Sequence, residues 1–148
     1  MSTVQIGQAA ALYDLAPSAL RWWERQGVFG EARHGNGRRQ YGEDDLRRIG
    51  VAYLCHVTGM MSLDNTAIVA SGTSDVQTWK TVVREQIAEL GERIEQIRAA
   101  RDYLHHLLDC QHDDMTQCAY LDDQIVAHTP RGRVAEPDIV TAARRTTR

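Results

Sequence analysis

Arginine and aromatic side chains concentrate in the first third of the chain. Between Arg21 and Tyr41 there are five arginines against two acids, Glu24 and Glu31. Guanidinium groups bind phosphates through charge and paired donors, and tyrosine or indole groups add neutral donors that fix the register on a nucleic-acid backbone. This excess of arginine is too large for an ordinary solvated face, so we expect a DNA-binding surface here. Its candidate residues are Ser18, Arg21, Trp22, Trp23, Arg33, Arg38, Arg39 and Tyr41.

Two of these candidates, Trp22 and Trp23, are adjacent in the sequence. On a helix, one of two neighbouring side chains usually points into the core. The sequence therefore leaves open which tryptophan faces DNA and which one packs inside.

A second group of reactive side chains lies near residue 110. Cys110 and Cys118 are close enough along the chain to hold one soft ion, and His112 is a further candidate ligand for a metal such as Zn²⁺. A reversible disulfide that senses redox state is an alternative, and so is a small organic ligand or no ligand at all. No cofactor is certain from these residues. Cys55 lies among apolar residues and is expected to be a buried, inert thiol.

Short helices must position the arginine-rich surface. Helical spacing of apolar residues predicts helices over 6–14 and 17–26, the second beginning at Pro17 and ending before Gly27. The stretch 28–42 contains Gly35-Asn36-Gly37, which is typical of the turn of a small hairpin. Helices over 42–57 and 62–69 follow. The pattern predicts a helix-turn-helix with a basic wing.

A long amphipathic segment follows over 75–108, with no proline and one glycine. The stripe of apolar side chains along this segment is narrow and is flanked by charged residues. This pattern favours a coiled coil between two chains over a helix that folds back on its own domain. The expected dimer interface consists of Val83, Ile87, Leu90, Ile94, Ile97, Arg101, Leu104 and Leu108.

Composition is ordinary for a soluble globular protein. The 148 residues are 43% hydrophobic and 25% charged, with a formal net charge of −3. Five aspartates and no lysine or arginine lie from Asp109 to Asp123, so the acidic end is far from the basic one. No stretch is long and apolar enough to span a membrane, and the N-terminus lacks a secretory signal, which favours the cytoplasm.

We therefore expect a mainly α fold. Residues 1–72 form a winged helix-turn-helix DNA-binding domain, 73–108 a long antiparallel coiled-coil dimerisation helix, 109–128 an effector loop with a short helix, and 129–148 a flexible polar tail.

The chain resembles the MerR family of transcriptional regulators in three stretches: QIGQAAALYDLAPSALRWWERQGVF from Gln5, then ARHGNGRRQY and GEDDLRRI. Residues 20–24 match the family's Leu-Arg-Tyr-Tyr-Glu helix motif with tryptophans in the tyrosine places, and 37–41 match its wing motif with Arg38 in a tyrosine place. The resemblance implies a homodimer on double-stranded promoter DNA, bending and untwisting the spacer between RNA polymerase elements.

The family resemblance also bears on the cysteine loop. The loop is similar to that of the copper-sensing branch, where two cysteines hold a monovalent ion. Divalent sensors of the family add a cysteine at the start of the dimerisation helix, where this chain has Thr73, Ser74 and Asp75.

Two other classes of protein fit the sequence less well. An enzyme is not expected, because there is no glycine-rich phosphate loop and no nucleophile elbow. A coiled-coil interaction protein would leave the basic wing unexplained.

Overall fold

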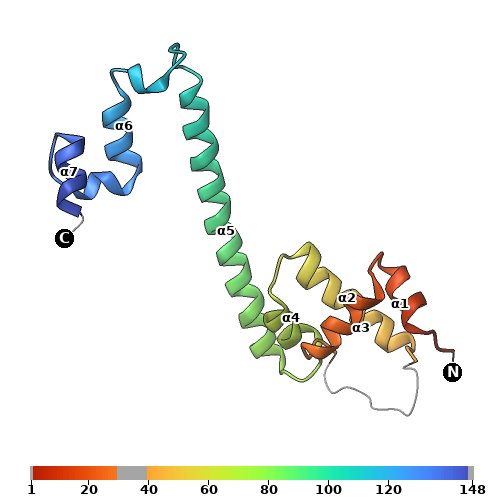
Figure 1. The fold of residues 1–148 in the computed structure, drawn as a ribbon. Coiled ribbons are helices and arrows are strands. Elements are labelled where there is room, and N and C mark those ends of the chain that lie inside the picture. The colour runs from red at the N-terminus through yellow and green to blue at the C-terminus, as the bar shows by residue number, and fades with distance from the viewer. Residues whose placement is uncertain (1, 30–39, 147–148) are drawn as a thin grey trace. The chain divides into compact units, whose positions relative to one another are not determined.

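The computed structural model describes residues 2–29 and 40–146, and its elements are helical (Figure 1). The predicted mainly α fold is confirmed. Within the described residues there is no strand, only an isolated antiparallel bridge between Val4 and Tyr41. The chain divides into two compact units, Met1–Ile94 and Glu95–Arg148. The helices are α1 (Ile6–Leu12), α2 (Pro17–Arg25), α3 (Glu43–Tyr53), the π-helical turn η1 (Leu54–Thr58), α4 (Leu63–Ala70), α5 (Val76–Leu107), the 3₁₀ turn η2 (Met115–Gln117), α6 (Leu121–His128), the 3₁₀ turn η3 (Pro130–Arg133) and α7 (Ile139–Thr146).

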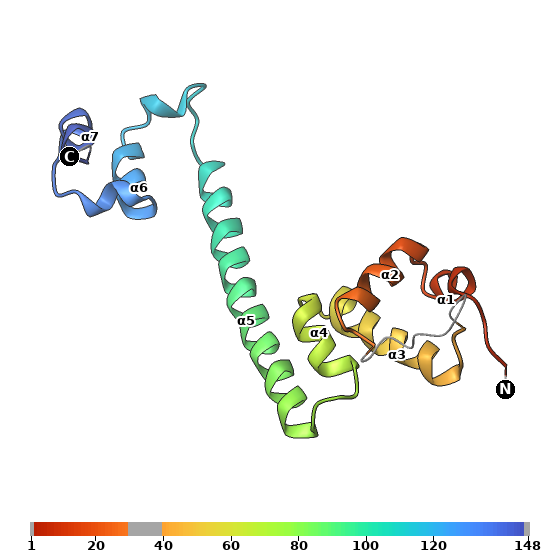
Figure 2. The same cartoon turned by 60° about the horizontal axis from the view of Figure 1, so that its bottom comes forward.

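The first unit is built around small residues that let its helices approach closely. Ala9 and Ala10 of α1 are fully buried and belong to the same core as Leu20 of α2 and Ile49 of α3. Figure 2 shows these three helices grouped beside α4. Because alanine carries only a methyl group, α1 can lie close to α2 without displacing the larger side chains.

Local signals in the sequence set the ends of α2. Pro17 is the first helical residue, where its missing N–H costs nothing. At the other end Gly27 has a φ of +79°, and the Val28 N–H donates to the carbonyl of Trp23 at 3.2 Å. A left-handed glycine with such a bond is a common way to close a helix, which confirms the predicted end.

The third helix differs from the prediction of one regular helix over 42–57. It is α-helical only to Tyr53, and η1 continues it as a π turn in which the Gly59 N–H donates to the Leu54 carbonyl at 2.8 Å. A Cβ on Gly59 would lie 2.8 Å from the Cys55 carbonyl oxygen, which restricts this position to glycine. Periodicity alone cannot distinguish such a single wide turn from regular helix.

The long helix α5 has a defined beginning and a defined attachment to the first unit. Asp75 caps it by accepting from the Thr78 N–H at 2.8 Å, and this backbone hydrogen bond lowers the pKa of the Asp75 carboxyl. Two and three turns after Asp75, Val82 and Gln86 are buried. The Gln86 side-chain amide donates to the Gly59 carbonyl at 3.0 Å, so the first half of α5 is held against the residue that follows η1.

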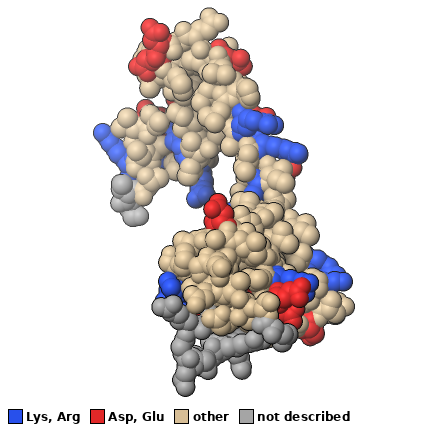
Figure 3. Space-filling view, turned by 90° about the vertical axis from the view of Figure 1, so that its right-hand side faces the viewer, with Lys and Arg blue, Asp and Glu red and all other residues tan. Residues whose placement is uncertain are grey.

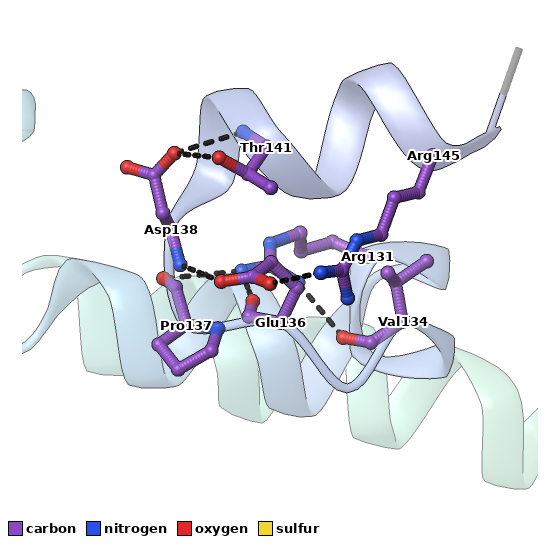
Figure 4. A network of polar contacts seen from close by, with 7 residues as sticks. All are labelled: Arg131, Val134, Glu136, Pro137, Asp138, Thr141 and Arg145. Atoms are coloured by element: carbon purple, nitrogen blue, oxygen red, sulfur yellow. Dashed lines mark hydrogen bonds and ion pairs between the residues drawn. The ribbon is translucent and has the colours of Figure 1, made fainter.

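The end of the chain is more structured than the flexible tail expected from its polar sequence. Figure 4 shows Arg131 between carbonyl groups, donating to Val134 at 3.0 Å and to Glu136 at 2.5 Å. The Glu136 carboxylate pairs with Arg145 of α7 at 3.0 Å. The sequence prediction missed this arrangement because polar contacts, with only Ala142 of α7 buried, take the place of an apolar core.

No helix in residues 2–29 and 40–146 combines the length and the apolar character that a membrane span requires.

Candidate nucleic-acid interface

One face of α2 carries an exposed polar and aromatic stripe. Ser18, Arg21, Trp22 and Arg25 are all exposed and follow the three- and four-residue spacing of a helix face. The Arg25 guanidinium lies 5.5 Å from the centre of the Trp22 ring, within the range of a cation–π contact. We call these four residues the α2 stripe. It offers the donors and cations that a phosphate backbone or a base edge accepts.

Arg25 was missing from the residues predicted to contact DNA. Its signal was present in the sequence, since it lies four residues after Arg21 and three after Trp22 and therefore shares their face. The helix motif covers residues 20–24 and stops one residue before Arg25.

The opposite face of α2 packs into the core. Trp23 is 4% exposed, against 49% for Trp22, which decides the question that the sequence left open. The Trp23 ring meets the His56 ring edge-on at a centroid distance of 5.6 Å. The Nδ1 atom of His56 lies 2.7 Å from the Met61 carbonyl oxygen. Trp23 therefore fixes α2 against η1 and is too deeply placed to contact DNA directly.

Tyr41 is also in the core, with 1% of its surface exposed. Its hydroxyl donates to the Glu24 carboxylate at 2.5 Å, and its backbone pairs with Val4. We therefore correct the prediction for Trp23 and Tyr41: their burial makes them residues that position α2 and the segment after residue 40, and neither presents a surface to DNA.

The wing arginines predicted from the sequence, Arg33, Arg38 and Arg39, lie outside the described residues. Their contribution to the interface stays a prediction.

The dimerisation stripe on α5 is exposed in the single chain. Five of its apolar side chains, Ile87, Ile94, Ile97, Leu104 and Leu108, are exposed, whereas Val83 and Leu90 are half-buried. Arg101 is exposed as well. An apolar stripe of this length in water is unfavourable unless another surface covers it.

The two loop cysteines lie on one hollow of the second unit. Cys110 and Cys118 are half-buried, and both line a pocket of about 440 Å³ together with side chains from the end of α5, from η2 and from α6. We call it the cysteine pocket. Backbone bonds hold both cysteines, because the Cys110 N–H donates to Leu107 and the Cys118 N–H donates to Met115.

Other predicted metal ligands do not join the two thiols. His112 is exposed and does not line the cysteine pocket. In the part of the chain that the structure describes, no three His, Cys, Asp or Glu side chains are grouped to hold a metal ion. Zn²⁺ in proteins takes three or four such ligands, so a zinc site at these two thiols would need further ligands, and the Zn²⁺ site stays a prediction. Two thiolates are sufficient for a two-coordinate monovalent ion.

The third cysteine, Cys55, lies on η1 and is half-buried. Desolvation by burial raises the pKa of its thiol, which keeps the group protonated and unreactive.

Comparison with known proteins finds one matching family and two similar relatives, all described as HTH-type regulators. Residues 4–61 match the family described as MerR HTH family regulatory protein. The chain is 27% identical over 121 residues to a protein of Chromobacterium violaceum named as a homolog of the HTH-type transcriptional activator SoxR, covering 79% of this chain and 82% of that protein. It is 29% identical to an uncharacterised HTH-type transcriptional regulator of Pseudomonas aeruginosa, covering 81% and 95%.

A solved structure supports the same fold. The crystal structure of HiNmlR, a MerR family regulator lacking the sensor domain, bound to promoter DNA, matches with a TM-score of 0.54 at 20% identity. The match covers 73% of this chain and 89% of that one.

The two tryptophans of α2 are predicted to respond differently to truncation. Trp23→Ala should lower the free energy of unfolding by about 3 kcal/mol, because it opens a cavity beside His56. Trp22→Ala should leave that free energy within roughly 0.5 kcal/mol and weaken DNA binding instead. Urea unfolding and a DNA-binding titration of each variant check this. Equal destabilisation by both changes would contradict the assignment of the two faces.

Proposed function

We propose that the chain, whose residues 4–61 match the MerR HTH family, is a DNA-binding transcriptional regulator that acts as a homodimer and distorts promoter DNA in response to a signal at the cysteine pocket. The observation that carries the proposal is the α2 stripe. It places two arginines and an exposed tryptophan on the outer face of the second helix of a helix-turn-helix.

The proposed docking follows from this geometry. The second helix of a helix-turn-helix enters the major groove and reads base edges, while neighbouring elements contact phosphates. In this chain Arg21 and Arg25 supply the cations of that helix, and Trp22 supplies an indole N–H and a flat apolar surface. The wing arginines, Arg33, Arg38 and Arg39, are proposed to contact flanking phosphates.

Pairing of two chains along α5 is proposed to set the distance between the two DNA-binding units. The helix has 32 residues, about 48 Å at ~1.5 Å per residue. Two copies related by a twofold axis present two α2 stripes to a pseudo-palindromic site. A fixed separation that differs from the relaxed spacing of the half-sites favours bent and untwisted DNA, which is how we propose that the dimer acts on RNA polymerase.

For the signal, the two thiols of the cysteine pocket support a thiol-dependent effector. A monovalent copper-group ion is the metal that these residues fit, because linear coordination needs only Cys110 and Cys118. A reversible disulfide between the same two residues is the redox form of this proposal.

DNA binding tests the main proposal. Arg21→Ala should weaken binding to promoter and to unrelated DNA alike and reduce the slope of log affinity against log salt by about 1, since one phosphate contact is lost. Arg98→Ala is the matched control, because Arg98 is an exposed arginine of α5 that pairs with Glu95. Fluorescence anisotropy at several salt concentrations measures both. Salt-independent binding would favour a coiled-coil interaction protein.

Dimerisation has a separate test. Ile97→Asp should yield a monomer at micromolar concentration, because a charge in the seam loses its hydration when the helices pair. Ala99→Asp adds the same charge at an exposed position outside the stripe and should leave the dimer intact. Sedimentation velocity distinguishes the two species. A dimeric Ile97→Asp variant would show that the chains do not pair along this stripe.

A metal titration tests the form of the signal. We expect the reduced protein to bind about one equivalent of Ag(I) per chain, with a loss of affinity on the order of 100-fold in Cys110→Ser and in Cys118→Ser. Zn(II) should bind weakly and independently of both cysteines. Ag(I) binding that survives both substitutions would exclude the pair as the metal site, and tight cysteine-dependent Zn(II) binding would show that further ligands assemble around it.

A further inference from the structure

Two exposed side chains of the α2 stripe contact each other. Trp22 and Arg25 are three residues apart and are therefore neighbours on the surface of the helix. The Arg25 Cζ lies over the Trp22 ring, 5.5 Å from the ring centre. Both side chains remain exposed around this contact. They form one paired group on the outer face of α2.

The backbone that carries this pair is fixed from the core side. Trp23, next to Trp22, is buried and packs edge-on against His56. Glu24, next to Arg25, accepts the Tyr41 hydroxyl at 2.5 Å. Because both residues between the pair are anchored, the position of the guanidinium depends on the torsions of its own side chain.

The Trp22 ring restricts those torsions. A free arginine side chain has many rotamers, and it loses that freedom when a complex fixes it. The contact with Trp22 removes part of this cost before DNA binds. Long side chains on a helix also lean toward its N-terminus, which is the direction from Arg25 to Trp22. The N-terminal part of a recognition helix is the part that contacts base edges, so the ring holds the guanidinium toward that part.

A guanidinium held over a ring keeps its hydrogen-bond donors available. Its flat face meets the ring, while its N–H groups point outward in its own plane. In the major groove, guanine presents two neighbouring acceptors, O6 and N7, whereas adenine presents an acceptor beside an amino donor. A planar fork of donors fits the guanine edge and meets a like donor at the adenine edge. A positioned guanidinium can therefore distinguish the two bases.

The charge of Arg25 is not taken up by a neighbouring acid. Figure 3 shows small groups of basic side chains on a largely uncharged surface, some of them next to acidic groups. Arg47 of α3 has acidic partners, since it lies 2.7 Å from the Glu43 carboxylate and 3.6 Å from that of Asp44. Among residues 2–29 and 40–146, no carboxylate pairs with Arg25. Its donors are left for an external acceptor.

From this arrangement we propose that Arg25 is the residue that reads a guanine in the major groove, and that Trp22 is the positioning residue that holds its guanidinium. The inference rests on the proposed function, because it assigns a base to one residue of the α2 stripe. On a twofold homodimer the guanine occurs once in each half-site.

Selection from a randomised DNA library tests the assignment. The reduced protein is mixed with duplexes of random central sequence, and the bound fraction is sequenced. We expect the wild-type chain to select a guanine at one position of each half-site. It should bind a selected duplex about tenfold more tightly than the same duplex with another base pair at that position.

Substitutions of Arg25 identify the reader. Arg25→Ala should lose the preference at this position alone and keep the rest of the selected sequence. Arg25→Lys keeps the charge without the planar fork and should retain a preference of about threefold at most. Arg21→Ala is the matched control from the same helix face; it should weaken binding to all sequences and leave the guanine preference unchanged.

Substitutions of Trp22 test the positioning role. Trp22→Ala should reduce the guanine preference to about threefold, and Trp22→Phe, which keeps an aromatic ring, should restore most of it. A general loss of fold would not act on one base position alone. Urea unfolding of the same variants should give unchanged midpoints, since both side chains are exposed.

Three results would overturn the inference and leave the proposed regulator intact. They are selection of the same guanine by Arg25→Ala, a uniform loss of affinity in Arg25→Ala with a salt slope lower by about 1, and a guanine preference that Trp22→Ala does not change. The second result would identify a phosphate contact instead of a base contact. If the wild-type chain selects no sequence at all, the proposed function itself is contradicted, and the inference fails with it.

Discussion

The arrangement of the DNA-binding unit depends on a short series of contacts around the turn η1. On one side the His56 ring meets Trp23, whose neighbour Trp22 is part of the α2 stripe. On the other side the Gly59 carbonyl accepts the side-chain amide of Gln86, buried in α5. Because the Gln86 side chain is buried, leaving its amide without a hydrogen-bond partner would be costly. The helix proposed to read DNA, α2, and the helix proposed to pair two chains, α5, are thus both anchored at η1 and the glycine that follows it.

The two faces of α2 have different roles, one in packing and one in the proposed contact with DNA. Leu20 and Trp23 are buried and set the depth and rotation of the helix, while Arg21, Trp22 and Arg25 share its outer face. Tyr41 adds a fixed point by binding the Glu24 carboxylate, which ties the segment after residue 40 to the end of the same helix. An arginine side chain is long and flexible, so its accuracy at a phosphate depends on the rigidity of the backbone that carries it.

Much of this fold could be predicted from the sequence, because local chemistry determines it. Pro17 and Gly27 mark the ends of α2, and the apolar spacing from Val83 onward predicts α5. What failed depends on contacts between distant residues. The spacing of apolar residues does not predict which tryptophan packs on His56, and it does not distinguish the π turn from regular helix. It also does not predict the Arg131 contacts near the C-terminus. The cysteine pair was visible in the sequence, whereas the other residues that line the pocket come from the end of α5, from η2 and from α6.

The π turn also bears on how chains of this kind are aligned. A π turn holds one residue more than the α turn it replaces, and Gly59 closes it with a bond to Leu54. Removing one residue between Tyr53 and Gly59 would let the same stretch close as regular α-helix while Tyr53 and Gly59 keep their neighbours. A single-residue gap at this place, in an alignment with a homologous sequence, is therefore expected to be absorbed inside the helix, and the segments before and after it stay comparable residue by residue.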